Sequence, residues 1–248
     1  EPAASAEAPA PKPLDEAALA RAVQLIRDAK RPFLYIGGGV QIAGAGEALV
    51  KLAETIGSPI GTSMMALAAV PHSHPLFLGM TGMHGRYAAS IALDRSDLII
   101  AVGTRFSDRA TGNKAEFSKN HKVLHIDIDP AEISKNIPAY VALVADVGQA
   151  LTALNEAGLP HSDPAWLAEV RELMAAPDNH LSMDASILNP ELVLQAVNKR
   201  LPPDSPVATD VGQHQMWVAQ YYHFERPRTF ITSGGLGTMG FGMGAAMG

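Results

Sequence analysis

Residues 33–40 read FLYIGGGV, an apolar run followed at once by three glycines. A short apolar run predicts a buried strand, and glycine directly after it permits a tight turn into a helix. A helical pattern follows from about Glu47 to Ile56 and stops at Gly57, a residue type that is common just past the last helical turn. The stretch therefore predicts a strand, a glycine turn and a helix, which is the repeating unit of an α/β fold.

The same unit recurs on both sides of this stretch. Residues 14–29 carry apolar side chains at helical spacing, and Asp15 is a candidate N-cap. Further short apolar runs predict strands at residues 59–61, 97–103 (DLIIAVG), 122–127 (KVLHID) and 140–144. This alternation predicts an α/β fold in which a parallel sheet carries helices on both faces.

We expect four segments along the chain. Residues 1–13 contain four prolines and no large apolar side chain, which is typical of a linker. Residues 14–157 form a central nucleotide-binding domain. Residues 158–188 form a connector with one short helical pattern at 165–175. Residues 189–248 begin a second α/β domain with a helix from Asn189-Pro190 to about Arg200 and a strand at PVATD, and we expect this domain to be truncated and the chain to be a fragment.

Composition excludes several classes of function. The 248 residues include 19 Lys and Arg against 25 Asp and Glu, a net charge of −6, and show no basic cluster for nucleic acid or an anionic membrane. No cysteine is present, so disulfides, thiolate metal sites and thiol nucleophiles are excluded. No apolar run approaches the roughly 18 residues of a membrane span, and no signal peptide is apparent. We therefore expect a soluble protein that binds neither nucleic acid nor a membrane.

Glycines and charged side chains follow the predicted strands. They occur in GMTGMHG (79–85), GTRFSDR (103–109) and HIDIDP (125–130), and at Asp146. Ligands bind at the carboxyl ends of parallel strands, so these residues predict a nucleotide with glycines and arginines near its phosphates and carboxylates near its ribose. Taken singly, each aspartate is equally explained as a helix N-cap, each arginine as a solvated surface residue, and the 37–39 glycines as a tight turn.

Other candidates are weaker or lie further along the chain. His72 and His74 form an H-x-H pair that is compatible with a metal site, although a metal is the less favoured interpretation. His84 fits stacking or hydrogen bonding better than metal ligation. DVGQHQMW (210–217) and GLGTMGFG (235–242) place glycines and polar side chains between a strand and a helix, and a capped strand–helix junction would explain them as well.

Five motifs in this order carry a resemblance: GMTGMHG, GTRFSDRATG, HIDIDP, TDVGQHQMW and PRTFITSGGLGTMGFG. Over about residues 15–248 the chain resembles the catalytic large subunits of acetolactate synthase (acetohydroxyacid synthase), which are thiamine diphosphate enzymes. The resemblance implies a central FAD-binding domain followed by the start of a thiamine diphosphate-binding domain. It also implies condensation of two pyruvates, or of pyruvate and 2-ketobutyrate, with loss of CO₂ in branched-chain amino-acid biosynthesis.

The resemblance implies FAD, thiamine diphosphate and Mg²⁺ as cofactors. The FAD contacts would be Gly38, Gly39, Met64, Gly82, Met83, His84, Gly103, Arg105, Arg109, Asp127, Ile128, Asp146 and Val147. The thiamine diphosphate contacts would be Val211, Gly212, Gln213, His214, Gly237 and Met239. Met239 would be the apolar wedge that holds this cofactor bent, and FAD would have a structural role only.

Three departures from the family pattern matter. Ser107 replaces a carboxylate of the usual F-D-D-R run. Where relatives have G-L-P-A-A, this chain has Gly242-Met243-Gly244-Ala245-Ala246 and so lacks the rigid proline. The family's activating glutamate and its Asp-Gly…Asn metal motif do not occur in these residues. We therefore assign no catalytic residue and no metal ligand here, and expect the chain alone to be inactive.

The resemblance further implies 2-keto acid substrates and a homodimer or homotetramer, with a small regulatory subunit as an optional partner. It implies a cytoplasmic location in a bacterium, or an organelle in a eukaryote. Two other functions stay open at this point: a non-catalytic FAD- or ADP-binding module, and a redox flavoenzyme of the pyruvate-oxidase type.

Overall fold

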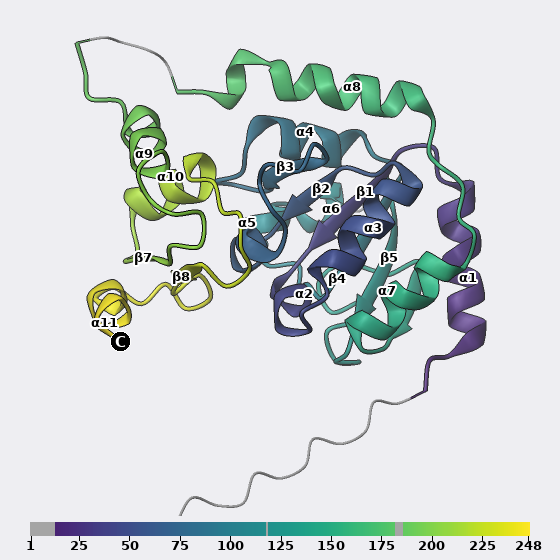
Figure 1. The fold of residues 1–248 in the computed structure, drawn as a ribbon. Helices are drawn as coiled ribbons and strands as arrows, with labels where there is room; N and C mark the ends of the chain where they lie inside the picture. The colour runs from purple at the N-terminus through teal and green to yellow at the C-terminus, as the bar shows by residue number, and fades with distance from the viewer. Residues whose placement is uncertain (1–12, 118, 182–185) are drawn as a thin grey trace, which may run out of the picture.

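A computed structural model describes residues 13–117, 119–181 and 186–248, and its centre is a six-stranded parallel sheet (Figure 1). The order in the sheet is β3-β2-β1-β4-β5-β6. The strands are β1 (Pro32–Ile36), β2 (Ile60–Thr62), β3 (Phe77–Met80), β4 (Leu98–Val102), β5 (Lys122–Asp127) and β6 (Val141–Val144). Every pair of neighbours runs parallel, so all six carboxyl ends lie at one edge.

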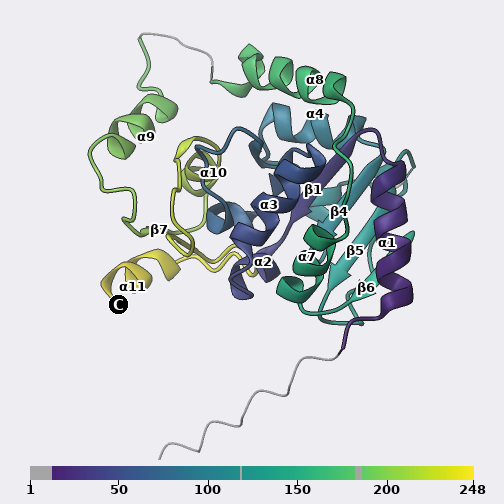
Figure 2. The ribbon, with the colours of Figure 1, turned by 45° about the vertical axis from the view of Figure 1, so that its right-hand side comes forward.

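Helices cover both faces of this sheet, as the sequence predicts. Along β1, Leu34 and Ile36 point into one apolar cluster, and Phe33 and Tyr35 point into another. The first cluster is closed by α1 (Glu16–Asp28), α2 (Gly38–Ile42), α3 (Gly46–Ile56) and α7 (Val147–Glu156), of which α1, α3 and α7 lie side by side in Figure 2. The second is closed by α4 (Tyr87–Arg95) and α8 (Pro164–Ala175). Because both faces are covered, the central strands are continuous apolar runs.

The ends of these helices follow local sequence signals. The Asp15 carboxylate accepts hydrogen bonds from the Ala17 and Ala18 amides at 2.9 and 3.0 Å and caps α1. Helix α3 stops at Gly57, which adopts the left-handed φ of +61°. Shorter helical turns lie at η1 (Met64–Ala69), α5 (Asp108–Thr111), α6 (Lys114–Phe117) and η2 (Pro177–Asn179).

Strand β3 is the main element that the sequence analysis missed. It is four residues long, and Gly79 within it has a φ of +97°. A glycine in such a conformation is a poor strand signal, and pairing with β2 supplies the order instead.

The predicted connector contains a helix that packs onto the six-stranded sheet. Helix α8 packs against α4, and its Trp166, Val170 and Leu173 are buried in the second cluster. The Trp166 indole N–H also donates to the Pro32 carbonyl at 3.0 Å. Residues 164–175 therefore cover the sheet. The proposed limits of the linker, domains and connector stay predictions, and residues 1–12 lie outside the described residues.

The remaining residues form a second, smaller unit. Strands β7 (Val207–Thr209) and β8 (Phe230–Thr232) pair in parallel beside α9 (Pro190–Asn198), α10 (Gln213–Tyr221) and α11 (Phe241–Met247). The two units touch through the segment before β3: the His72 amide donates to the Phe224 carbonyl at 2.9 Å, and the Ser73 hydroxyl donates to Glu225 at 2.6 Å. Within the described residues, no helix combines the length and apolar character that a bilayer crossing needs.

Candidate functional site

The order of the strands creates a switch point between β1 and β4. These two strands are neighbours at the centre of the sheet, and the chain proceeds outward from β1 through β2 and β3 and from β4 through β5 and β6. Loops that leave such a pair diverge, and open parallel sheets bind ligands in the crevice that results.

The thirteen residues predicted to contact FAD all lie at or just beyond this edge of the sheet. They are Gly38 and Gly39 after β1; Met64 after β2; Gly82, Met83 and His84 after β3; Gly103, Arg105 and Arg109 after β4; Asp127 and Ile128 at the end of β5; and Asp146 and Val147 after β6. The fold thus brings together residues that are spread over more than a hundred positions of sequence. Their contacts with FAD stay predictions.

The glycines of the β1 and β4 loops are explained by contact between the two loops. The Gly37 amide donates to the Val102 carbonyl at 2.9 Å, and the Gly39 amide donates to the Gly103 carbonyl at 3.1 Å. A Cβ on Gly37 would lie 2.1 Å from the Gly103 oxygen, and a Cβ on Gly39 would lie 2.7 Å from the Gly103 Cα. The tight-turn interpretation therefore suffices for Gly37 and Gly39. Close approach of the loops also keeps bulky side chains away from the switch point.

Two exposed arginines stand at the end of β4. Among the residues that the structure describes, neither Arg105 nor Arg109 forms an ion pair. The Arg109 carbonyl accepts the Met83 amide at 2.9 Å, which ties the loop after β3 to α5. A pocket of about 410 Å³ opens beside this contact, lined by Gly82, Met83, Arg109, Asn113 and Glu116 among others. Unpaired guanidinium groups at a parallel-sheet edge suit a ligand that carries phosphates.

The carboxylates at the end of β5 and after β6 hold main-chain turns. Asp127 accepts the Asp129 amide at 2.9 Å, and Asp146 accepts the Gln149 amide at 3.0 Å and caps α7. Both bonds use Oδ1. The N-cap interpretation therefore holds for Asp146. A contact with ribose hydroxyls stays a prediction for both residues.

Apolar residues at this edge differ in exposure. Met83 is 70% exposed and Ile128 is 67% exposed, whereas Val147, the first residue of α7, is buried in the first cluster. The two exposed side chains are available to a flat ring. Val147 could meet a ligand only through its main chain.

Asp210 assembles the second predicted site. Its carboxylate accepts the Val211 amide at 2.7 Å and the Gly240 amide at 2.9 Å. These amide donors hold the pKa of Asp210 below its usual range. The contact joins the loop after β7, which carries Val211 and Gly212 and leads into α10 at Gln213 and His214, to the loop that carries Gly237 and Met239.

The groups of this second site face outward. Gln213 and His214 are exposed at the start of α10, which has no side-chain cap, so the amides of these two residues are open to an anion. The Gln215 amide already donates to the Gly212 carbonyl at 3.1 Å. Met239 is 80% exposed, and Gly237 adopts a φ of +66°. The sequence analysis placed Asp210 in the candidate motif DVGQHQMW but did not count it among the cofactor contacts. Its position directly after β7, at the carboxyl end of a parallel strand, was the sequence signal that pointed to a site residue.

His84 lies where the two units meet. Its carbonyl accepts the Gln220 side-chain amide of α10 at 2.8 Å. The glycine-rich loop after β3 therefore contacts the second unit near the end of α10.

The H-x-H pair takes part in packing. His72 donates through Nε2 to the Leu67 carbonyl at 2.8 Å, and its ring stacks on Phe77 with 4.1 Å between centroids. Phe224 meets the same ring edge-on at 5.4 Å. Within the described ranges, no group of three His, Cys, Asp or Glu side chains could hold a metal. These contacts support a packing role for the half-buried His72.

The burial of His72 predicts a pH dependence of stability. Burial lowers its pKa to about 3, whereas an unfolded histidine titrates near 6.5. As pH falls below about 6.5 the unfolded chain gains a proton that the folded chain does not, so stability falls toward pH 3 by up to ~1.4 kcal/mol per pH unit. The loss of unfolding free energy between pH 7 and pH 5 should therefore be about 2 kcal/mol smaller in His72→Phe. Urea titrations at both pH values measure this; equal losses in the two proteins would contradict it.

Comparison with known proteins identifies the family. Residues 19–154 match the family described as "Thiamine pyrophosphate enzyme, central domain", and residues 210–248 match "Thiamine pyrophosphate enzyme, C-terminal TPP binding domain". The chain belongs to the thiamine pyrophosphate enzymes. The two matched regions coincide with the six-stranded unit and with the β7–β8 unit from Asp210 onward.

Curated relatives within this family are similar along most of the chain. The acetolactate synthase large subunit of Corynebacterium glutamicum is 44% identical over 92% of the chain. That of Haemophilus influenzae is 40% identical, and a probable acetolactate synthase large subunit of Methanocaldococcus jannaschii is 42% identical, each again over 92% of the chain. The chain spans 37%, 41% and 40% of the length of these three relatives. The family resemblance and the α/β fold inferred from sequence are thus confirmed, and thiamine diphosphate is the cofactor of the family.

Proposed function

We propose that this chain is the flavin-binding part and the beginning of the thiamine diphosphate-binding part of an acetolactate synthase. The observation that carries the proposal is the 44% identity to a large subunit of that enzyme over 92% of the chain. The two matched family regions, residues 19–154 and 210–248, contain both clusters of site residues. The reaction would condense two pyruvates, or pyruvate and 2-ketobutyrate, with release of CO₂. Its products would feed the synthesis of branched-chain amino acids.

The residues at the switch point fit FAD. Arg105 and Arg109 would donate to its diphosphate, because both are exposed and neither is paired with a carboxylate among the described residues. The Oδ2 atoms of Asp127 and Asp146, which accept no hydrogen bond from the described residues, would face ribose hydroxyls. Met83 and Ile128 would contact the rings. In this proposal FAD supplies no redox step and acts as a structural ligand.

The residues of the second cluster fit thiamine diphosphate. When bound, this cofactor supplies the electron sink for loss of CO₂ from a 2-keto acid. The open amides at the start of α10 and the side chains of Gln213 and His214 would bind and orient it. Asp210 would hold the Gly240 loop so that Met239 presses an apolar side chain against it. Mg²⁺ would accompany the diphosphate, and we assign none of its ligands to these residues.

The assembly and location of the protein are part of the same proposal. We place the protein in the cytoplasm of a bacterium, as a homodimer or homotetramer that is able to accept a small regulatory subunit. The division into a linker (1–13), central domain (14–157), connector (158–188) and C-terminal domain (189–248) belongs to it as well.

A segment exchange tests the proposed activity. The 234 matched residues of the Corynebacterium glutamicum large subunit are replaced by those of this chain. With thiamine diphosphate, Mg²⁺ and FAD, the hybrid should form acetolactate from pyruvate at on the order of 1–10 per second. The 248-residue chain alone should form none, because the activating glutamate and the metal motif of the family are not among its residues.

The outcomes separate the alternatives. A folded hybrid that retains FAD but forms no acetolactate would favour a binding module. Stoichiometric bleaching of the flavin by pyruvate would favour a redox enzyme of the pyruvate-oxidase type. Acetolactate from the chain alone would contradict the assignment of its catalytic groups to other segments.

A further inference from the structure

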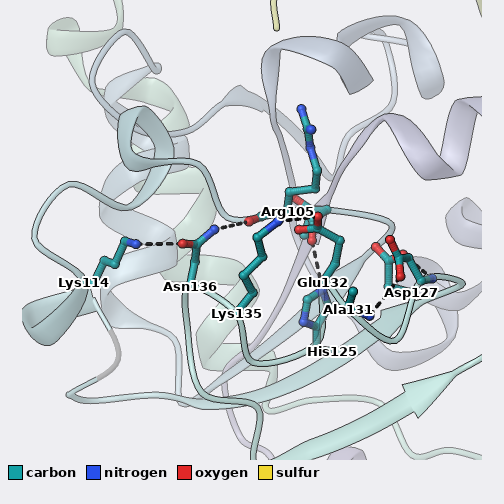
Figure 3. A network of polar contacts seen from close by, with 10 residues as sticks. Arg105, Lys114, His125, Asp127, Ala131, Glu132, Lys135 and Asn136 are labelled. Carbon is teal, nitrogen blue, oxygen red and sulfur yellow. Dashed lines mark hydrogen bonds and ion pairs between the residues drawn. The ribbon is translucent and has the colours of Figure 1, made fainter.

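We propose that His125 and Asn136 are positioning residues that fix the main chain of Arg105, so that its guanidinium is held ready for a diphosphate ligand. This inference rests on the flavin site proposed above. It assigns a function to two side chains that the sequence analysis did not include, and Figure 3 shows their contacts.

His125 holds the residue before Arg105. It lies fully buried within β5, and its Nε2–H donates to the Thr104 carbonyl at 2.9 Å. Because a carbonyl only accepts, the proton must be on Nε2. Burial lowers the pKa of His125 and keeps the ring neutral, with its buried Nδ1 unpartnered.

Asn136 holds the next carbonyl along the chain. Its Nδ2–H donates to the Arg105 carbonyl at 3.0 Å, and its Oδ1 accepts from Lys114 Nζ at 2.7 Å. Two consecutive carbonyls are thus each held by a side chain from a different part of the sequence. Figure 3 shows the Arg105 side chain projecting away from both of these contacts.

The following residue is held in an unfavourable conformation. Phe106 has a φ of +50°, in the left-handed region that bulky residues avoid. Its buried ring lies against His125 at 5.2 Å, Tyr35 at 5.6 Å and Phe117 at 5.8 Å between centroids. Strain of this kind persists only where the surroundings over-determine the backbone, which is most often at functional sites.

These contacts have one common result. The main chain on both sides of Arg105 is immobilised, while its side chain is exposed and forms no ion pair within the described residues. A fixed backbone reduces the conformational freedom that the arginine loses when it binds a phosphate. Removal of Asn136 should therefore weaken binding only when Arg105 is present.

A double-mutant cycle with ADP as the probe tests this dependence. Calorimetry would give the dissociation constants of the unaltered 248-residue chain, Asn136→Ala, Arg105→Ala and the double variant. We expect Asn136→Ala to weaken ADP binding about fivefold in the presence of Arg105, as for loss of one ordinary hydrogen bond. In the Arg105→Ala background the same change should alter binding by less than about twofold.

Asn155→Ala is the matched control. Asn155 also donates its side-chain amide to a main-chain carbonyl, that of Ala48 at 2.9 Å, but it joins α7 to α3. It should leave ADP binding unchanged. His125→Phe keeps an aromatic ring beside Phe106 and should reproduce the Arg105-dependent loss of ADP binding. If His125→Phe fails to fold, the test rests on the Asn136→Ala variants, because Asn136 is only half-buried.

Each result is decisive. An equal loss for Asn136→Ala with and without Arg105 would overturn the positioning role and leave the flavin site standing. Equal losses for Asn155→Ala and Asn136→Ala would also overturn it. Absence of ADP binding by the unaltered chain would overturn the flavin site itself, and this inference with it.

Discussion

Replacing Arg105 with alanine is expected to weaken the binding of ADP or FAD by about 10- to 150-fold, which corresponds to loss of a charge-assisted hydrogen bond of roughly 1.5–3 kcal/mol. Arg105 follows β4 at the switch point of the sheet, and its guanidinium is exposed and can bind a phosphate through two parallel hydrogen bonds. Calorimetric titration of both proteins with ADP measures the effect.

The control for this prediction is Arg171→Ala. Arg171 is exposed on α8, so its removal makes the same change in net charge away from the strand ends. Equal affinities of Arg105→Ala and Arg171→Ala would show that the phosphates bind elsewhere.

Replacing Trp166 with alanine is expected to lower the free energy of unfolding by about 3–5 kcal/mol. The side chain is 1% exposed, fills the cluster between α4, α8 and the sheet, and donates to the Pro32 carbonyl at 3.0 Å. Its removal leaves a cavity and an unpartnered carbonyl at the start of β1. Urea unfolding followed by circular dichroism measures the loss.

Two further variants serve as controls for the loss of stability in Trp166→Ala. Trp166→Phe keeps much of the packing but loses the hydrogen bond, and should cost less than Trp166→Ala. Met174→Ala, on the same helix and 37% exposed, should cost under about 1 kcal/mol. A similarly small loss for Trp166→Ala would mean that residues 164–175 are a separable connector.

Much of the fold could be predicted because the local signals are strong. The runs at 33–36 and 98–102 are strands buried on both faces, so their sequences are apolar without interruption. The run at 122–127 is buried from Val123 onward and keeps three apolar residues among its six. Asp15, Gly57 and Asn189 mark helix ends through bonds or backbone angles that involve only nearby residues. The motifs of the two sites were visible for the same reason, since each is a contiguous stretch after a strand.

Other elements depend on contacts between distant residues. Strand β3 contains a glycine and is ordered by pairing with β2, and α8 lies in a stretch whose prolines indicate a connector. In the sequence alone, His125 is one residue of a predicted buried strand, and Asn136 is one polar residue of a loop. Their bonds to Thr104 and Arg105 span 21 and 31 positions. No periodicity in the sequence reports such bonds.

The sequence by itself determined the α/β class, the central strands, the helix caps and the two clusters of motifs, because each depends on side chains within a few positions of one another. The tertiary structure decided how these pieces meet. It placed β1 beside β4, and the loops after these strands pack so closely that only glycine fits at positions 37 and 39, against Gly103 more than sixty residues away. It also placed Asp210 against Gly240, which joins the two loops of the second site. Hydrogen bonds and steric contacts act through space, and only the folded chain determines which distant residues come within their range.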